Sequence, residues 1–219
     1  MSDLTDSRAA TDALLGVLSQ GRFKPSAVGR FLGMAAHRSL RQAAYRPRAL
    51  IQVTVVHALL LAVSRDRAGR RWVTAAWCLA VLHLGLLEHR DRLSSADVLT
   101  LLRGNLPATA LGSCRWSGVL ALSSDLADGR LARRQGTCTP FGDYADSLAD
   151  AAFWTWLVLR YEPSRTVRTA ALAAWAAPVT AVTAVALRHG AMPERPRPAL
   201  LRPAAALQAV VAARRLARR

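Results

Sequence analysis

Along the chain, apolar runs alternate with short links that carry most of the charge. The apolar runs cover residues 49–64, 72–87, 98–111, 116–128, 141–161, 167–187 and 199–213. A helix rises about 1.5 Å per residue, so the longest runs match a bilayer core of roughly 30 Å and the shorter ones fall below it. The pattern predicts an all-α integral membrane protein, a bundle of about six (five to seven) transmembrane helices.

Residues 25–45 show a different, amphipathic pattern. Their apolar positions are Val28, Phe31, Leu32, Met34, Ala35 and Leu40, and their basic positions are Arg30, Arg38 and Arg41. Pro25 suits the first turn of a helix, and a basic amphipathic helix is typical of the membrane interface. We expect residues 1–48 to form a cytoplasmic N-terminal region with this interfacial helix, and residues 49–219 to form the transmembrane domain. The alternative is a soluble helix packed on another domain.

Composition supports the membrane and argues against nucleic acid. Thirty Lys and Arg residues oppose 14 Asp and Glu, which gives a formal net charge of +16. Such an excess is typical of proteins that bind nucleic acid or an anionic membrane surface, and the apolar runs favour the membrane. The three cysteines, Cys78, Cys114 and Cys138, fit no metal or disulfide spacing, so we expect free thiols. The polar, acidic start lacks the order of a signal peptide.

Four aspartates stand out against this apolar background. Asp125 and Asp128 are three residues apart, and Asp146 and Asp150 are four apart, so each pair shares one face of a helix. Two helices joined by the short basic link at 130–134 pack antiparallel and can bring all four carboxylates together. A charge inside a membrane costs about 2.5 to 3.5 kcal/mol on insertion scales, and hard divalent cations offset that cost most simply.

Two other interpretations of the aspartates remain open. They can form a solvated acidic face, or they can pair with Arg130, Arg133 and Arg134 without any metal. If a metal cluster forms, two cations can clamp a pyrophosphate during phosphoryl transfer. Small residues on the same helix as the first Asp pair would let a phosphate approach its backbone, and the guanidinium of Arg133 can hold a phosphate with two hydrogen bonds.

Topology follows from the basic links. With the N-terminus and the 130–134 link in the cytoplasm, the runs alternate consistently up to residue 187. The basic turn at 65–71 then falls outside, against the positive-inside rule. If residues 199–213 also crossed, the basic tail at 214–219 would fall outside too, so we expect this last segment to be interfacial or re-entrant. Arg103, inside an apolar run, is either functional or snorkels to the interface.

The residues between 125 and 150 resemble the signature of the CDP-alcohol phosphotransferases, also called CDP-alcohol phosphatidyltransferases. All fixed positions of that signature are present: Asp125, Asp128, Gly129, Ala132, Arg133, Gly142, Asp146 and Asp150. The resemblance implies a phospholipid-synthesis enzyme whose donor is CDP-diacylglycerol or a similar CDP-linked lipid. In the reaction that the resemblance implies, an acceptor alcohol attacks the phosphoryl group and CMP leaves, with the help of two Mg²⁺ or Mn²⁺ ions.

The resemblance also implies roles for single residues. It makes Asp125, Asp128 and Asp146 metal ligands, and it makes Asp150 the general base and a further metal contact. The CDP-binding residues would be Asp125, Gly129, Ala132, Arg133 and Gly142. For a phosphorylated acceptor, the candidate basic residues are Arg103, Arg134, Arg188 and Arg195. The family is usually a homodimer with six spans, and we expect an integral protein of the cell (plasma) membrane with its active site facing the cytoplasm.

Three other functional classes are also compatible with aspartates in an apolar chain. A prenyltransferase-like membrane enzyme also uses Asp-rich motifs and magnesium, but it would lack the glycine, alanine and arginine of this signature. An intramembrane Asp-rich cation transporter would move metal without nucleotide. A catalytically inactive relative would retain the fold without turnover.

Overall fold

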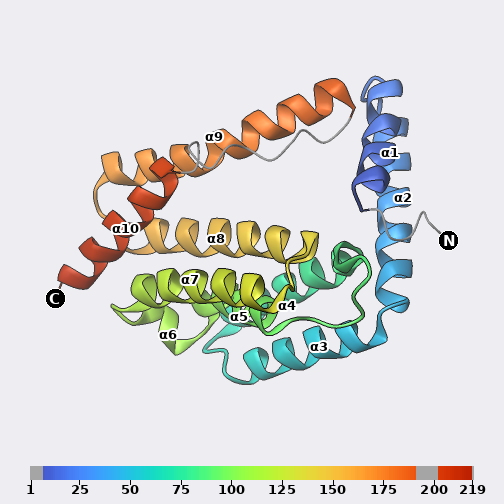
Figure 1. Ribbon diagram of the computed structural model, residues 1–219. Helices are drawn as coiled ribbons and strands as arrows, with labels where there is room; N and C mark the ends of the chain where they lie inside the picture. The colour runs from blue at the N-terminus through green and yellow to red at the C-terminus, as the bar shows by residue number, and fades with distance from the viewer. Residues whose placement is uncertain (1–6, 191–201, 219) are drawn as a thin grey trace.

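Three helices form the centre of the molecule. The computed structural model describes residues 7–190 and 202–218, and in these ranges all regular structure is helical. α7 (Ser117–Gln135) and α8 (Pro140–Tyr161) run antiparallel, side by side, and the short α5 (Ser95–Gly104) packs against both (Figure 1). Gly104 allows this packing, because a Cβ there would lie only 3.1 Å from the Cβ of Ala149 on α8.

The other helices surround this centre. α3 and α4 form an antiparallel pair on one side, α9 and α10 lie on the other, and α1 and α2 stand beside the end of α9 (Figure 1). Their bounds are α1 Ser7–Gln20, α2 Pro25–Ala44, α3 Pro47–Ala62, α4 Arg67–Leu82, α9 Arg165–His189 and α10 Arg202–Ala217, with a 3-10 turn, η2, at Leu84–Leu87. The all-helical class predicted from the apolar pattern is confirmed for the described residues.

The basic link between the two Asp pairs is helical, which corrects the prediction of a connection at 130–134. α7 continues through these residues because Ala, Leu, Arg and Gln favour helix. It ends at Gly136, whose φ of +60° suits glycine. The amide of Thr137 donates to the carbonyl of Ala132 at 2.9 Å, which closes the last turn. The true connection is therefore only 136–139.

The apolar run at 98–111 is not one helix. It is divided into α5, the 3-10 turn η3 (Leu106–Ala108) and α6 (Ala110–Ser113). Pro107 cannot donate a hydrogen bond within a continuous helix. At the other end of α5, Ser94 and Asp97 form a capping box in which the hydroxyl of Ser94 accepts from the Asp97 amide. The short α5 thus has a fixed start and places Arg103 near its end.

The last helix packs into the bundle. Ala212 of α10 lies against α7 at Gly118, where a Cβ would be only 2.9 Å away, so α10 is held along α7. Its interfacial or re-entrant placement in the membrane stays a prediction. Arg214 and Arg218 pair with the buried Glu162, which follows α8. Burial raises the pKa of Glu162, but hydrogen bonds from these arginines and from the Ser164 amide outweigh it and lower the pKa to about 2.

The surface supports contact with lipid. Within the described residues, α9 is the one helix long and apolar enough to cross a membrane by length and composition, and α3 is a shorter apolar helix. Large apolar side chains are exposed on the outer helices, among them Leu32, Leu40, Ile51, Leu59 and Val179. Soluble monomers rarely expose so many, and such surfaces mark contact with a membrane or a partner. The predicted number of spans stays a prediction.

Candidate active site

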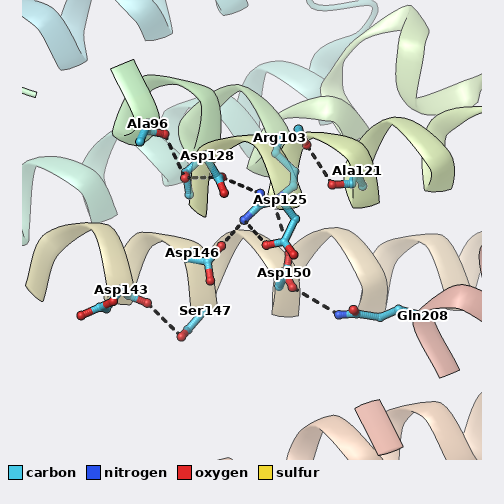
Figure 2. A network of polar contacts seen from close by, with 12 residues as sticks. Ala96, Arg103, Ala121, Asp125, Asp128, Asp143, Asp146, Ser147, Asp150 and Gln208 are labelled. Atoms are coloured by element: carbon cyan, nitrogen blue, oxygen red, sulfur yellow. Dashed lines mark hydrogen bonds and ion pairs between the residues drawn. The ribbon is translucent and has the colours of Figure 1, made fainter. Parts of the chain in front are cut away.

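All four aspartates of the signature meet at one point, around a single arginine. Asp125 and Asp128 come from α7, Asp146 and Asp150 come from α8, and Arg103 reaches between them from α5 (Figure 2). The Arg103 side chain is fully buried and contacts all four carboxylates. The ion pairs are 2.7 Å to Asp128, 3.2 Å to Asp150 and 3.4 Å to Asp125, with a further pair to Asp146.

The positions of the four aspartates argue against both alternatives to a metal site, a solvated acidic face and pairing with the arginines of 130–134. The aspartates are not simply a solvated face, because Asp128 is buried and Asp150 is largely so. Within the described residues, Arg130, Arg133 and Arg134 form no ion pair with them. Arg103 is their shared counterion, and one guanidinium among four ionised carboxylates leaves a formal charge of −3. That excess favours the binding of further cations.

Three of the four carboxylates fit a metal ion. One oxygen each of Asp125, Asp128 and Asp146 lies within 4.8 Å of the other two, and carboxylate oxygens are the ligands that Mg²⁺ and Mn²⁺ prefer. Asp128 is also held by the hydroxyl of Thr100, which donates to it at 2.7 Å. A rigid ligand of this kind suits a metal site.

Asp150 stands apart from this group of three. Its Oδ1 faces Nε of Arg103 at 3.2 Å, and its Oδ2 accepts a hydrogen bond from Gln208 at 3.2 Å. The side chain keeps one quarter of its surface exposed. The carboxylate is thus oriented by neighbours from two other helices, which fits a separate role from the metal ligands.

A polar cavity opens beside the aspartates. Its volume is about 410 Å³, within the usual range for ligand sites. Its lining includes every residue predicted to bind CDP, namely Asp125, Gly129, Ala132, Arg133 and Gly142. Asp128 and Asp146 line it as well. The structure therefore brings the small and basic residues of the signature to the same space as the proposed metal ligands.

The two glycines of this cavity have close neighbours. A Cβ at Gly129 would lie 3.3 Å from Nη1 of Arg133, so the guanidinium lies over the bare backbone. A Cβ at Gly142 would lie 3.1 Å from an oxygen of Asp97. Side chains at these positions would fill the cavity or move the groups that line it.

The predicted acceptor residues are not brought together. Arg103 is enclosed by the four aspartates, so binding an acceptor would require it to leave them. Arg134 is exposed near the end of α7, and Arg188 is exposed at the end of α9, where Gly190 approaches Ser19 of α1. Arg195 lies outside the described residues. The acceptor site stays a prediction.

Comparison with known proteins agrees with this geometry. The sequence model of the family described as CDP-alcohol phosphatidyltransferase matches residues 93–214. The chain belongs to this family. No curated protein and no solved structure matches it. The match spans α5 to α10, so it includes every helix that contributes to the aspartate cluster.

Family membership settles the general chemistry. CDP-alcohol phosphatidyltransferases are membrane-associated transferases that move a phosphoryl group from a CDP-alcohol to an acceptor alcohol, and they generally depend on divalent metal. This assignment disfavours the prenyltransferase-like enzyme. The match begins at residue 93, so the boundary predicted at residue 48 stays a prediction.

Gln208 is a site residue that sequence analysis missed. It lies on α10, 58 residues from Asp150, and its amide Nε2 donates to Asp150 Oδ2 (Figure 2). The one signal for Gln208 in the sequence is the polarity of its side chain. It is the single uncharged polar side chain within 202–217, among alanine, leucine, valine, arginine and one proline, and a polar group on an apolar helix face needs a partner.

We expect Gln208→Met to lower kcat about tenfold and to leave KM for the CDP donor unchanged. The thioether matches the length of glutamine but cannot donate, so Asp150 loses the bond that orients it, and hydrogen bonds to charged groups contribute about 1.5 to 3 kcal/mol. Steady-state kinetics measures both constants. Gln208→Asn, which retains a shorter amide, should recover part of the rate, whereas wild-type kcat in Gln208→Met would show that the contact is only structural.

Proposed function

We propose that this enzyme transfers a phosphatidyl, or other substituted phosphoryl, group from a CDP-linked lipid such as CDP-diacylglycerol to the hydroxyl of an acceptor alcohol, and releases CMP. The reaction would be a step of phospholipid biosynthesis. One observation carries the proposal. The four signature aspartates converge, and the other residues of the signature line the cavity beside them.

The cavity suits the nucleotide end of the donor. The donor's pyrophosphate is anionic, and Arg133 offers a planar guanidinium that can hold a phosphate with two hydrogen bonds. Gly129 and Ala132 leave the helix backbone accessible beneath it. The acidic Asp125, Asp128 and Asp146 would repel the same phosphates unless cations lie between them.

Asp125, Asp128 and Asp146 would hold Mg²⁺ or Mn²⁺, and we propose two ions with Asp150 as a further contact. Bound cations would supply electrostatic stabilisation of the charge that develops on the phosphoryl oxygens. Asp150 would accept the proton of the acceptor hydroxyl. The oxygen of that hydroxyl would form a bond to phosphorus as the bond from phosphorus to CMP breaks. Gln208 and Arg103 hold the Asp150 carboxylate in place for this transfer.

The environment of the reaction is also part of the proposal. The exposed apolar helices would lie in the cell membrane, with the active site facing the cytoplasm. A homodimer is proposed from the family resemblance. The N-terminal region 1–48 would lie at the cytoplasmic interface, since α2 exposes Leu32 and Leu40 beside its basic residues.

The proposal is tested by CMP release. Purified protein in detergent would be incubated with CDP-diacylglycerol, Mg²⁺ or Mn²⁺ and a panel of alcohols and alcohol phosphates, with and without chelator. We expect metal-dependent release of CMP with one acceptor, together with the matching phospholipid product. CDP-lipid binding without release under any condition would favour a catalytically inactive relative, and metal flux without nucleotide dependence would favour a transporter.

A further inference from the structure

A second polar cavity lies at the end of the bundle opposite the aspartates, which we call the distal pocket. It is bounded by the start of α4, by η3 and α6, and by the end of α8. Its volume is about 750 Å³, and its charged lining residues are Arg65, Arg160 and Asp66. Its lining also includes Trp72, Trp156, Tyr161 and Ser113. None of these residues lines the cavity beside the aspartates.

The distal end of the molecule is strongly basic. Its arginines are Arg65, Arg67, Arg70, Arg71, Arg115, Arg160, Arg165, Arg168, Arg214, Arg215 and Arg218, and its described acidic residues are Asp66 and Glu162. Asp66 caps α4 by accepting from the Gly69 amide at 2.7 Å, and Glu162 is paired with Arg214 and Arg218. Within the described residues, no carboxylate forms an ion pair with either arginine of the pocket.

The walls of the distal pocket are held by specific contacts. Arg65 donates to the hydroxyl of Ser113 at 2.5 Å. Arg215 of α10 donates to the Ser113 carbonyl at 2.9 Å, and its guanidinium lies 3.4 Å from the centre of the Tyr161 ring. Trp72 donates to the Gly104 carbonyl at 2.9 Å. The pocket is therefore built from four separate helical segments that are tied to one another.

Its chemistry matches the headgroup layer of a membrane. The candidate span α9 begins at Arg165, directly after the Tyr161 end of α8, so the pocket would lie at the level where that helix enters a bilayer. Tryptophan and tyrosine concentrate at this level, and arginine binds phosphate through paired hydrogen bonds. The basic turn at 65–71 also contradicts the positive-inside rule in the predicted orientation, and a bound anion would offset its charge.

We infer that the distal pocket binds the phosphate group of an anionic phospholipid headgroup, between Arg65 and Arg160. The aromatic residues of the lining would contact the glycerol region, and the acyl chains would extend into the surrounding bilayer. The site is separate from catalysis, so it does not depend on the donor, the acceptor or the metal of the transfer reaction.

Lipid binding to the intact protein tests this site. Native mass spectrometry would follow the protein in detergent as short-chain phosphatidylglycerol and phosphatidylcholine are added in equal amounts. We expect the wild-type protein to prefer phosphatidylglycerol, and Arg65→Ala/Arg160→Ala to bind it at least about tenfold more weakly, since both guanidinium groups that would hold the phosphate are removed.

Arg70→Ala/Arg71→Ala is the matched control. It removes the same amount of charge from the same end of the molecule, but neither residue lines the pocket, so phosphatidylglycerol binding should be retained. Equal losses in both double variants would indicate diffuse attraction and overturn the site, as would no loss in either. Displacement of the lipid by an equal concentration of inorganic phosphate would overturn the headgroup assignment. Arg65→Lys/Arg160→Lys, which retains the charge, should fold normally and bind with intermediate affinity.

Discussion

Asp150→Asn is expected to lower kcat by about 10² to 10⁴-fold, the usual contribution of a general base. The amide is the same size as the carboxylate but cannot accept the acceptor's proton. Asp150 lies outside the group of three carboxylates that fits a metal ion, and the amide retains an oxygen that can contact a cation, so nucleotide binding and metal binding at that group should be largely retained. Calorimetric titration with CDP measures nucleotide binding, and a kinetic assay of CMP release measures turnover.

Asp91→Asn is the control for this variant. Asp91 pairs with Arg48 at 2.6 Å, and both side chains are more than half exposed, so the pair contributes little to stability. Its loss should leave kcat unchanged. Turnover at the wild-type rate in Asp150→Asn would remove Asp150 from the mechanism, and loss of CDP binding in that variant would make it a ligand and not a base.

Arg103→Met is expected to destabilise the protein by about 3 to 5 kcal/mol in metal-free buffer, because it leaves buried carboxylates without their shared counterion. The methionine fills part of the same space without charge. Added Mg²⁺ or Mn²⁺ should restore much of the lost stability, since cations can replace the guanidinium among the aspartates. Thermal unfolding in detergent, with chelator and with metal, measures both quantities.

Arg168→Met provides the comparison for Arg103→Met. Arg168 donates to the carbonyl of Glu162 at 2.7 Å and lies away from the aspartates, so its loss should lower stability equally with and without metal. If Arg103→Met melted at the wild-type temperature in chelator, the aspartates would not need a counterion. If metal gave this variant no more protection than it gives Arg168→Met, the cluster would not bind cations.

Much of the architecture follows from local sequence. Pro25, Pro47 and Pro140 each stand at the first turn of a helix, and the Asp pairs share helix faces because of their spacing. The convergence of those pairs was also predictable, since a short connection between two helices favours an antiparallel arrangement, and α5 packs against both α7 and α8 in it.

Other features depend on contacts that local pattern does not report. The charge at 130–134 suggests a link, but these residues are helical and the signal that ends α7 is Gly136. The sequence makes Arg103 a candidate acceptor ligand, and only the packing of α5 against α7 and α8 shows that it is enclosed by carboxylates. Gln208 reaches Asp150 across 58 residues, a separation over which neither periodicity nor spacing carries information.

Anomalous diffraction from crystals grown with Mn²⁺ and CDP tests the metal site most directly. We predict manganese density bound by Asp125, Asp128 and Asp146, with the CDP pyrophosphate beside it in the cavity lined by Gly129 and Arg133. Arg103 should then have given up part of its contact with these three carboxylates. CDP in that cavity with no manganese on the aspartates, and with Arg103 still paired to all four, would contradict a metal-dependent transferase site.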